Sequence, residues 1–291
     1  MERQLIAAAA CLVASMACGQ ALANTSAGAS LSLLEIQLFD LDPTDGITPG
    51  VSFASTSGTT ASSTVSYGQT FYQYQIDNGA GAFGPVDASV TPANGVVGSS
   101  ASVSGSPFEA GGLALATSVF ANATGTALGS SGAFLMDGPY PESFVLTPET
   151  SMVISAAATV TATADQWPTY FEEASGNVQL QLAGTTSDGP QSSIAKLLAA
   201  AGYGYGPSSF DSASDELSVS FVNATTSTSS GSFVGQAMSY AYTLAPAVPE
   251  PGGGSLLTLA LGAFGFSSLR GRLRASAALD AQRGGLPADL S

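Results

Sequence analysis

The chain has 291 residues and no histidine, and its 6 basic and 21 acidic side chains give a formal net charge of −15. Its two cysteines, Cys11 and Cys18, both lie near the N-terminus. Without histidine there is no base for a Ser-His-Asp or Cys-His site and no histidine ligand for zinc. The acidity argues against nucleic acid as a partner, because nucleic-acid binding depends on a basic surface.

Residues 1–23 have the organisation of a secretory signal peptide. Arg3 precedes an apolar run, and Ala21 and Ala23 place small residues three and one before the expected cleavage point. A retained anchor and lipid attachment at Cys18 are the alternatives, and they fit the residues less well. Cleavage after Ala23 would remove both cysteines. The exported chain would then be held together by packing and hydrogen bonds alone, without disulfides.

Residues 24–245 are predicted to form one β-rich domain with a single basic residue, Lys196. Apolar and polar residues alternate along several segments that are separated by Ser, Thr and Gly, which is typical of strands. These segments are 32–40, 144–163, 178–182, 217–221 and 240–242. Many short strands without a βαβ rhythm indicate an all-β fold, an antiparallel β-sandwich or a jelly-roll-like domain.

One segment, residues 192–201, departs from this alternation. Ile194, Leu197 and Leu198 have helical spacing, and Gly202 follows at the position of a C-cap. We therefore expect a short helix here. A buried strand is the alternative.

An acidic cluster at Asp40, Asp42 and Asp45 follows the first predicted strand. Three carboxylates in six residues offer the hard oxygen ligands that Ca²⁺ prefers, although their spacing is not that of an EF-hand loop. The same residues suit a turn, because Pro43 and the Asp-Gly pair are common turn residues. The turn is the favoured interpretation, and calcium is the only cofactor suggested.

A second candidate site is the aromatic and acidic stretch around Trp167 and Tyr170. Exposed aromatic rings beside carboxylates can stack on sugars, which would suit glycan binding. Burial at one end of the sandwich is the favoured alternative, because aromatic side chains usually contribute to cores. Glu172 and Glu173 are adjacent and would face opposite ways in a strand, so they do not form the converging pair of a glycosidase. No catalytic residue is identified, and we expect a protein that is not an enzyme.

The C-terminal region, residues 246–274, has three parts in a fixed order. Pro249, Glu250 and Pro251 are followed by an uncharged apolar stretch, residues 252–269, that is slightly short for a spanning helix. A basic cluster comes next, made of Arg270, Arg272 and Arg274. By the positive-inside rule this cluster stays in the cytoplasm and the body lies outside. Residues 275–291 would form a cytoplasmic tail.

This ending resembles the PEP-CTERM sorting signal of Gram-negative bacteria that produce exopolysaccharide. The resemblance covers the Pro249–Pro251 motif, the apolar helix and the arginine cluster, and the chain departs from the pattern only in its longer tail. It implies export, transient anchoring in the inner membrane, and processing near the motif by an exosortase. The function it implies is that of a non-catalytic surface or matrix protein associated with exopolysaccharide or biofilm. A calcium-dependent carbohydrate-binding or adhesin module is the alternative.

Overall fold

The computed structural model describes ten ranges of the chain: residues 24–54, 58–68, 71–80, 83–92, 95–109, 111–122, 125–137, 143–165, 171–204 and 208–244. The predicted signal peptide, the sorting region and the tail lie outside these ranges. None of the described residues forms a helix long and apolar enough to cross a membrane.

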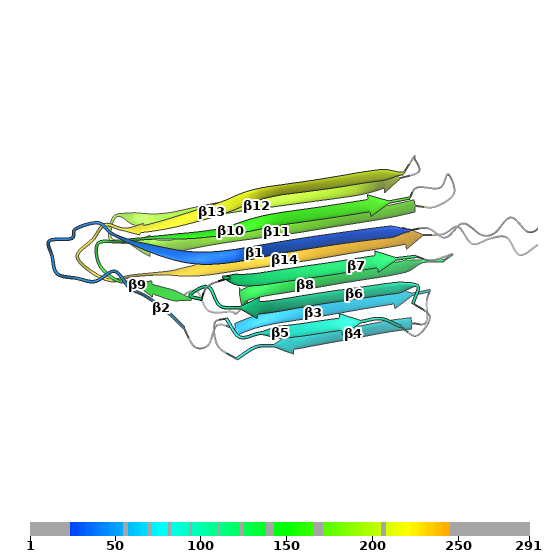
Figure 1. Ribbon diagram of the computed structural model, residues 1–291, viewed down its shortest axis with the longest axis horizontal. Coiled ribbons are helices and arrows are strands. Elements are labelled where there is room, and N and C mark those ends of the chain that lie inside the picture. The colour runs from blue at the N-terminus through cyan, green and yellow to red at the C-terminus, as the bar shows by residue number, and fades with distance from the viewer. Residues whose placement is uncertain are drawn as a thin grey trace, which may run out of the picture. The chain divides into compact units, whose positions relative to one another are not determined.

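Every element of the described chain is a β-strand, and every strand pair is antiparallel, so the all-β prediction is confirmed. Two sheets face each other as a sandwich (Figure 1). The six-stranded sheet has the order β13 (Ser209–Asn223), β10 (Thr150–Ala164), β1 (Thr25–Asp40), β7 (Leu113–Ala121), β6 (Val97–Gly105) and β5 (Val86–Val90).

The second sheet is eight-stranded and carries the surface described below. Its main path is β12 (Gly189–Gly204), β11 (Phe171–Thr186), β14 (Ser229–Leu244), β8 (Ala127–Asp137), β3 (Gly58–Tyr67) and β4 (Phe71–Asn78). Two short strands complete it: β9 (Phe144–Leu146) pairs with β14, and β2 (Val51–Phe53) pairs with β9.

The expected helix at 192–201 is wrong, because this segment is the middle of β12. It pairs with β11 residue by residue, from Thr186 opposite Gly189 to Ala174 opposite Ala201. Ile194 and Leu198 point outward, whereas Ala199 and Ala201 are buried. Gly202 has the positive φ of 67° expected of a C-cap, but it sits in an irregular step near the end of a strand.

The other predicted segments are strands, except that 144–163 is divided by a turn at 147–149 into β9 and β10. The pattern also changes once within β1. Leu34 is fully buried, as its alternation predicts, and so is Leu31 three residues earlier. A β-bulge lies between them, where Leu33 has a φ of 54°. The bulge changes which residues face inward, from odd-numbered before it to even-numbered after it.

The core is bulky toward one end of the sandwich and made of small residues toward the other. Phe144 and Phe221 pack edge to face, with ring centroids 5.3 Å apart, at the bulky end. Toward the end where β1 begins, buried alanines line both sheets, and Ala174 pairs with Ala201 on one side and Ala241 on the other. Small side chains let the two sheets approach closely at this end.

Gly176, on the inner face of β11, marks a place where the two sheets approach closely. A Cβ atom there would overlap the carbonyl oxygen of Gly28 in the opposite sheet and would lie 3.1 Å from that of Thr161. Backbone atoms cannot move aside as a flexible side chain can, so even a methyl group has no room.

The strands that bear the two ends of the described chain share one end of the sandwich: β1 begins and β14 ends there (Figure 1). The Asp165 amide donates to the Asn24 carbonyl oxygen over 3.2 Å and fixes the start of β1 at this end.

We predict that Gly176→Ala destabilises the fold by about 2 kcal/mol, because the added methyl forces the sheets apart. Gly125→Ala is the matched control, since the nearest atom to a Cβ at that glycine is 3.9 Å away. Chemical denaturation of the two variants measures the difference. Equal stabilities would show that the sheets do not pack as closely as described.

Candidate functional site

The outer face of the eight-stranded sheet carries side chains in rows that cross all six main strands. One row is fixed by the register of successive pairs and runs Leu198, Asn177, Met238, Gly132, Ser62 and Ile76. The neighbouring row runs Ala200, Ser175, Tyr240, Ser130, Thr64 and Tyr74. Residues far apart in the sequence therefore form one continuous surface.

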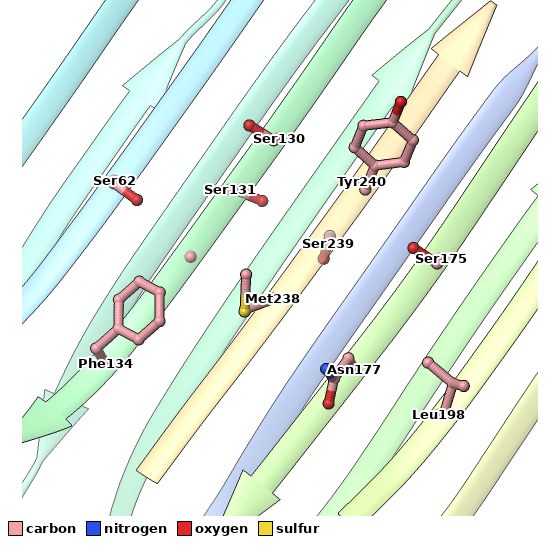
Figure 2. Close-up of a pocket in the computed structure, with 11 residues that line it drawn as sticks. Ser62, Ser130, Ser131, Phe134, Ser175, Asn177, Leu198, Met238, Ser239 and Tyr240 are labelled. Atoms are coloured by element: carbon pink, nitrogen blue, oxygen red, sulfur yellow. The ribbon is translucent and has the colours of Figure 1, made fainter. Parts of the chain in front are cut away.

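A groove of about 270 Å³ is hollowed into this face. Figure 2 shows its side chains, with Phe134 from β8, Met238 and Tyr240 from β14, and Ser175 and Asn177 from β11. The groove combines two rings and a thioether with several hydroxyls and an amide.

Gly132 shapes the groove by having no side chain. A Cβ atom at this position would overlap the ring of Phe134 and would lie 3.4 Å from Ser62 Oγ. The Phe134 ring therefore lies across the position where a side chain would otherwise project. The Phe134 ring thus forms an apolar side of the groove.

Amide side chains continue the polar surface beside the groove. Gln179 Nε2 donates to Gln181 Oε1 over 3.0 Å, and Gln236 Nε2 donates to Gln179 Oε1 over 3.4 Å. Burial raises the pKa of the half-buried Tyr240 phenol, and the nearby Glu173 carboxylate adds to the rise. Tyr240 is therefore a neutral hydroxyl at physiological pH, able both to donate and to accept a hydrogen bond.

No residue that lines the groove is charged, although the chain as a whole is strongly acidic. A hollow on the outer face of the six-stranded sheet is different. It has a volume of about 570 Å³ and is lined by Glu35, Asp215 and Glu216 beside the β1 bulge. The two outer faces of the sandwich thus offer different chemistry, one neutral and one anionic.

The predicted acidic cluster forms a turn at the end of β1, and its carboxylates bind the turn's own backbone. Asp40 Oδ1 accepts from the Asp42 amide over 3.0 Å, and Asp45 Oδ1 accepts from the Ile47 amide over 2.6 Å. Asp42 Oδ1 accepts from both the amide and the hydroxyl of Thr44, and these bonds lower the pKa of the Asp42 carboxyl. Such bonds are typical of Asx turns.

The fold also brings Glu149 to this turn, which the sequence did not indicate. Its carbonyl oxygen accepts from the Leu41 amide over 2.8 Å. Desolvation raises the pKa of the Glu149 carboxyl, and the charges of Asp42 and Asp45 raise it further. Within the described ranges, however, no three acidic, histidine or cysteine side chains are grouped closely enough to hold a metal ion. Calcium binding by Asp40, Asp42 and Asp45 stays a prediction.

The second predicted site falls mostly outside the described residues. Trp167 and Tyr170 lie in the range 166–170, which the structure does not describe, as do the processing motif, the arginine cluster and the cleavage-site alanines. Of the adjacent acids, Glu172 is fully buried between the sheets and Glu173 is on the outer face, so the two do face opposite ways.

Glu172 is a buried carboxyl group near the end of the sandwich where β1 begins. Neither of its oxygens has a hydrogen-bond partner among the described residues, and Thr25 Oγ1 beside it has none either. Burial raises the pKa of Glu172 to about 7, and the charge of Asp165 adds to the rise.

No protein-family model matches the chain, and no curated protein is similar to it in sequence.

We predict that Glu172 makes the fold less stable as the pH rises. The pKa of Glu172 is higher in the folded chain than its ordinary 4.5, so the folded state binds the proton more tightly than the unfolded state does. The contribution of this group to the free energy of unfolding is therefore complete below pH 4.5 and is lost as the pH rises through about 7. Glu172→Gln should raise stability relative to the natural chain at pH 8, by at most about 3 kcal/mol. It should have little effect at pH 4.

Thermal unfolding of both chains from pH 4 to pH 9 tests this. Glu173→Gln, one residue away on the outer face, is the control and should leave the pH dependence unchanged. If Glu172→Gln gave the same curve as the natural chain, the carboxyl would not be buried in the folded state.

Proposed function

We propose that this chain is an exported, non-catalytic protein of the cell surface or extracellular matrix that associates with neutral polysaccharide. The observation that carries this proposal is the uncharged groove on the outer face of the eight-stranded sheet. Its rings, hydroxyls and amide suit the two kinds of surface that a sugar presents, apolar ring faces and a rim of hydroxyl groups.

The negative charge of the chain favours a neutral polysaccharide over an acidic one as the partner. An acidic protein repels polyanions over distances set by ionic strength. A neutral glycan has no such barrier, and an uncharged groove leaves no buried charge unpaired on binding. The flat, rowed surface also favours a long polymer over a small molecule, because a ligand can lie across several strands at once.

The proposed route to the surface rests on the ends of the chain. The signal peptide would direct export, and the Pro249–Pro251 motif with its apolar segment and arginines would direct sorting by an exosortase at the inner membrane. The family resemblance supports this part of the proposal, independently of the groove.

A calcium-dependent carbohydrate-binding or adhesin module is the alternative, and the approach of Glu149 to the three aspartates favours it. The aspartate oxygens, however, already accept hydrogen bonds within the turn. Binding of Ca²⁺ would have to displace or share these bonds. A rise of several degrees in the melting temperature on addition of Ca²⁺, lost in Glu149→Gln, would favour this alternative.

We predict that Tyr240→Ala and Asn177→Ala each weaken binding to neutral polysaccharide by about tenfold, because each removes one polar or stacking contact worth about 1.4 kcal/mol. Migration of the full chain through native gels containing neutral or acidic polysaccharides measures the effect.

Phe210→Ala is the matched control for this experiment. Phe210 is an aromatic residue, 67% exposed, on β13 of the other sheet, and its loss should leave retention unchanged. Retention by acidic polymers alone, or equal retention of all three variants, would contradict the proposal.

We also predict that the protein recovered from its native host begins at Asn24 and ends near Pro249 to Pro251. Intact mass measurement with mapping of both termini tests this, and any excess mass would reveal glycosylation. A chain that still carried Arg270 to Ser291 would be a membrane-anchored protein, and the matrix function would lose its main support.

A further inference from the structure

Apart from the three-residue strand β2, which pairs only with β9, the sandwich has four sheet edges among the described residues. Unpaired backbone groups at an edge can pair with another chain. At one side, β12 and β13 are the edge strands of their sheets. At the other side, the edge strands are β4 and β5 (Figure 1). These four edges differ sharply in how their backbone groups are satisfied.

The edges at β12 and β13 are closed by each other's side chains. Gln191 forms a double bridge to Val222: it donates to the carbonyl oxygen over 2.8 Å and accepts from the amide over 3.1 Å. Asp211 accepts from the Ala200 amide over 3.0 Å, and further bonds join Ser209 to Gly202 and Ser193 to Ser220. A third strand would have to break these bonds in order to pair here.

The edge at β5 is protected by its length and by its neighbours. The strand has only five residues and lies between Pro85 and Pro92. Its backbone is also bonded by side chains from the opposite sheet: Asp77 Oδ2 accepts from the Asp87 amide over 3.2 Å, and Ser63 Oγ donates to the Ala88 carbonyl oxygen over 2.7 Å.

The edge at β4 has none of these protections. Among the residues that the structure describes, β4 pairs only with β3, and no side chain bonds to the backbone of its eight residues. Its sequence, FYQYQIDN, has no proline or lysine and is rich in residues that favour strands. Tyr72, Tyr74 and Ile76 project from its outer face and are 70%, 49% and 48% exposed. Each of these features makes an edge more able to pair.

We propose that β4 is an assembly edge, at which two copies of this chain pair antiparallel across a two-fold axis and join their eight-stranded sheets. Antiparallel pairing of β4 with itself keeps its two faces separate. With Tyr74 opposite its copy, Tyr72 meets Ile76 on the outer face and Gln73 meets Gln75 on the other. Aromatic and apolar side chains thus meet one another, and amides meet amides, as favoured cross-strand pairs require.

Charge identifies the occupant as a second copy. A positively charged partner would bind where carboxylates cluster on this acidic chain. The outer face of β4 carries no carboxylate, so it does not suit such a partner. The one charged residue of the strand, Asp77, meets Phe71 or Gln73 in registers centred on Tyr74 or Gln75, and not its own copy. Two chains of like charge can therefore associate here without bringing carboxylates together.

Pairing at β4 would also place the outer faces of the two copies side by side. The groove begins at Ser62 on β3, the strand next to this edge, and the row of residues through its centre ends at Ile76 on β4 itself. A dimer would present two grooves on one continuous sheet, so a polymer could bind both. The dimer itself does not depend on what the groove binds.

Sedimentation of the full chain in mild detergent, over a range of concentrations, tests the proposal. We expect a dimer for the natural chain and a monomer for Tyr74→Lys, which puts two ammonium groups near each other at the edge. Ile194→Lys is the control, because Ile194 is a similarly exposed apolar residue, 52% exposed, on the outer face of β12. The Ile194→Lys variant should remain dimeric. Any association through the apolar C-terminal region would be the same in both variants, so a difference between them reports on the β4 edge.

Cysteine cross-linking locates the contact. In a chain with Cys11→Ser and Cys18→Ser, a cysteine at 73, 74 or 75 should form a disulfide-linked dimer at the position nearest the two-fold axis, since residues directly opposite are close enough for the bond. Ile194→Cys should form none. A monomeric natural chain, or a dimer that persists in Tyr74→Lys and does not cross-link at any of the three positions, would overturn the proposal.

Discussion

The close contact between backbone atoms at Gly176 and Gly28 determines how the rest of this sandwich is built. Because no side chain separates the sheets there, neighbouring inward positions hold small or β-branched side chains, with alanine at Ala174 and Ala29 and valine at Val178. A core of this kind buries little apolar area per residue, and most of the bulky packing lies toward the other end. The long strands add many backbone hydrogen bonds, which compensate for the small apolar area that this part of the core buries. This suits a chain whose exported form would have no disulfide.

The same strands connect the core to the surface. Gly176 faces inward on β11, and its neighbours Ser175 and Asn177 face outward into the groove. The groove is therefore built on a closely packed part of the fold. Its shape depends on strand register and on the missing side chain of Gly132, not on loops, so it should be rigid before any ligand arrives. A preformed site loses little entropy when it binds a polymer.

The sequence predicted the fold class well and the surface poorly, for a physical reason. Alternation reveals which residues of one strand share a face, and within 178–182, 217–221 and 32–40 the apolar face includes Leu180, Val219 and Leu34, which are buried. It does not reveal which strands are neighbours. The groove draws its residues from five strands across the sheet, so no local sequence motif predicts it.

The sequence-based prediction failed where strand pairing or a bulge decided the outcome. The expected helix at 192–201 rested on Ile194, Leu197 and Leu198, whose spacing fits a helix as well as it fits two faces of a strand; pairing with β11 decided between them. In β1, the bulge at Leu33 changes which residues face inward. Ala27 and Leu31 before it and Leu34 after it therefore do not follow one continuous alternation, and the sequence pattern predicted only the part of the strand from residue 32 onward. Glu149 joins the aspartate turn only through long-range pairing of β1 with β10.

The shared location of the first and last described strand ends has a mechanical consequence. Anything attached before Thr25 or after Leu244 would be joined to the sandwich at the same end. A protein tethered in that way can swing about one point, and the opposite end and both outer faces stay free to meet other molecules. Tension on the tether would be applied first where the core is smallest and Glu172 is buried, so the least bulky part of the fold would be loaded before the rest.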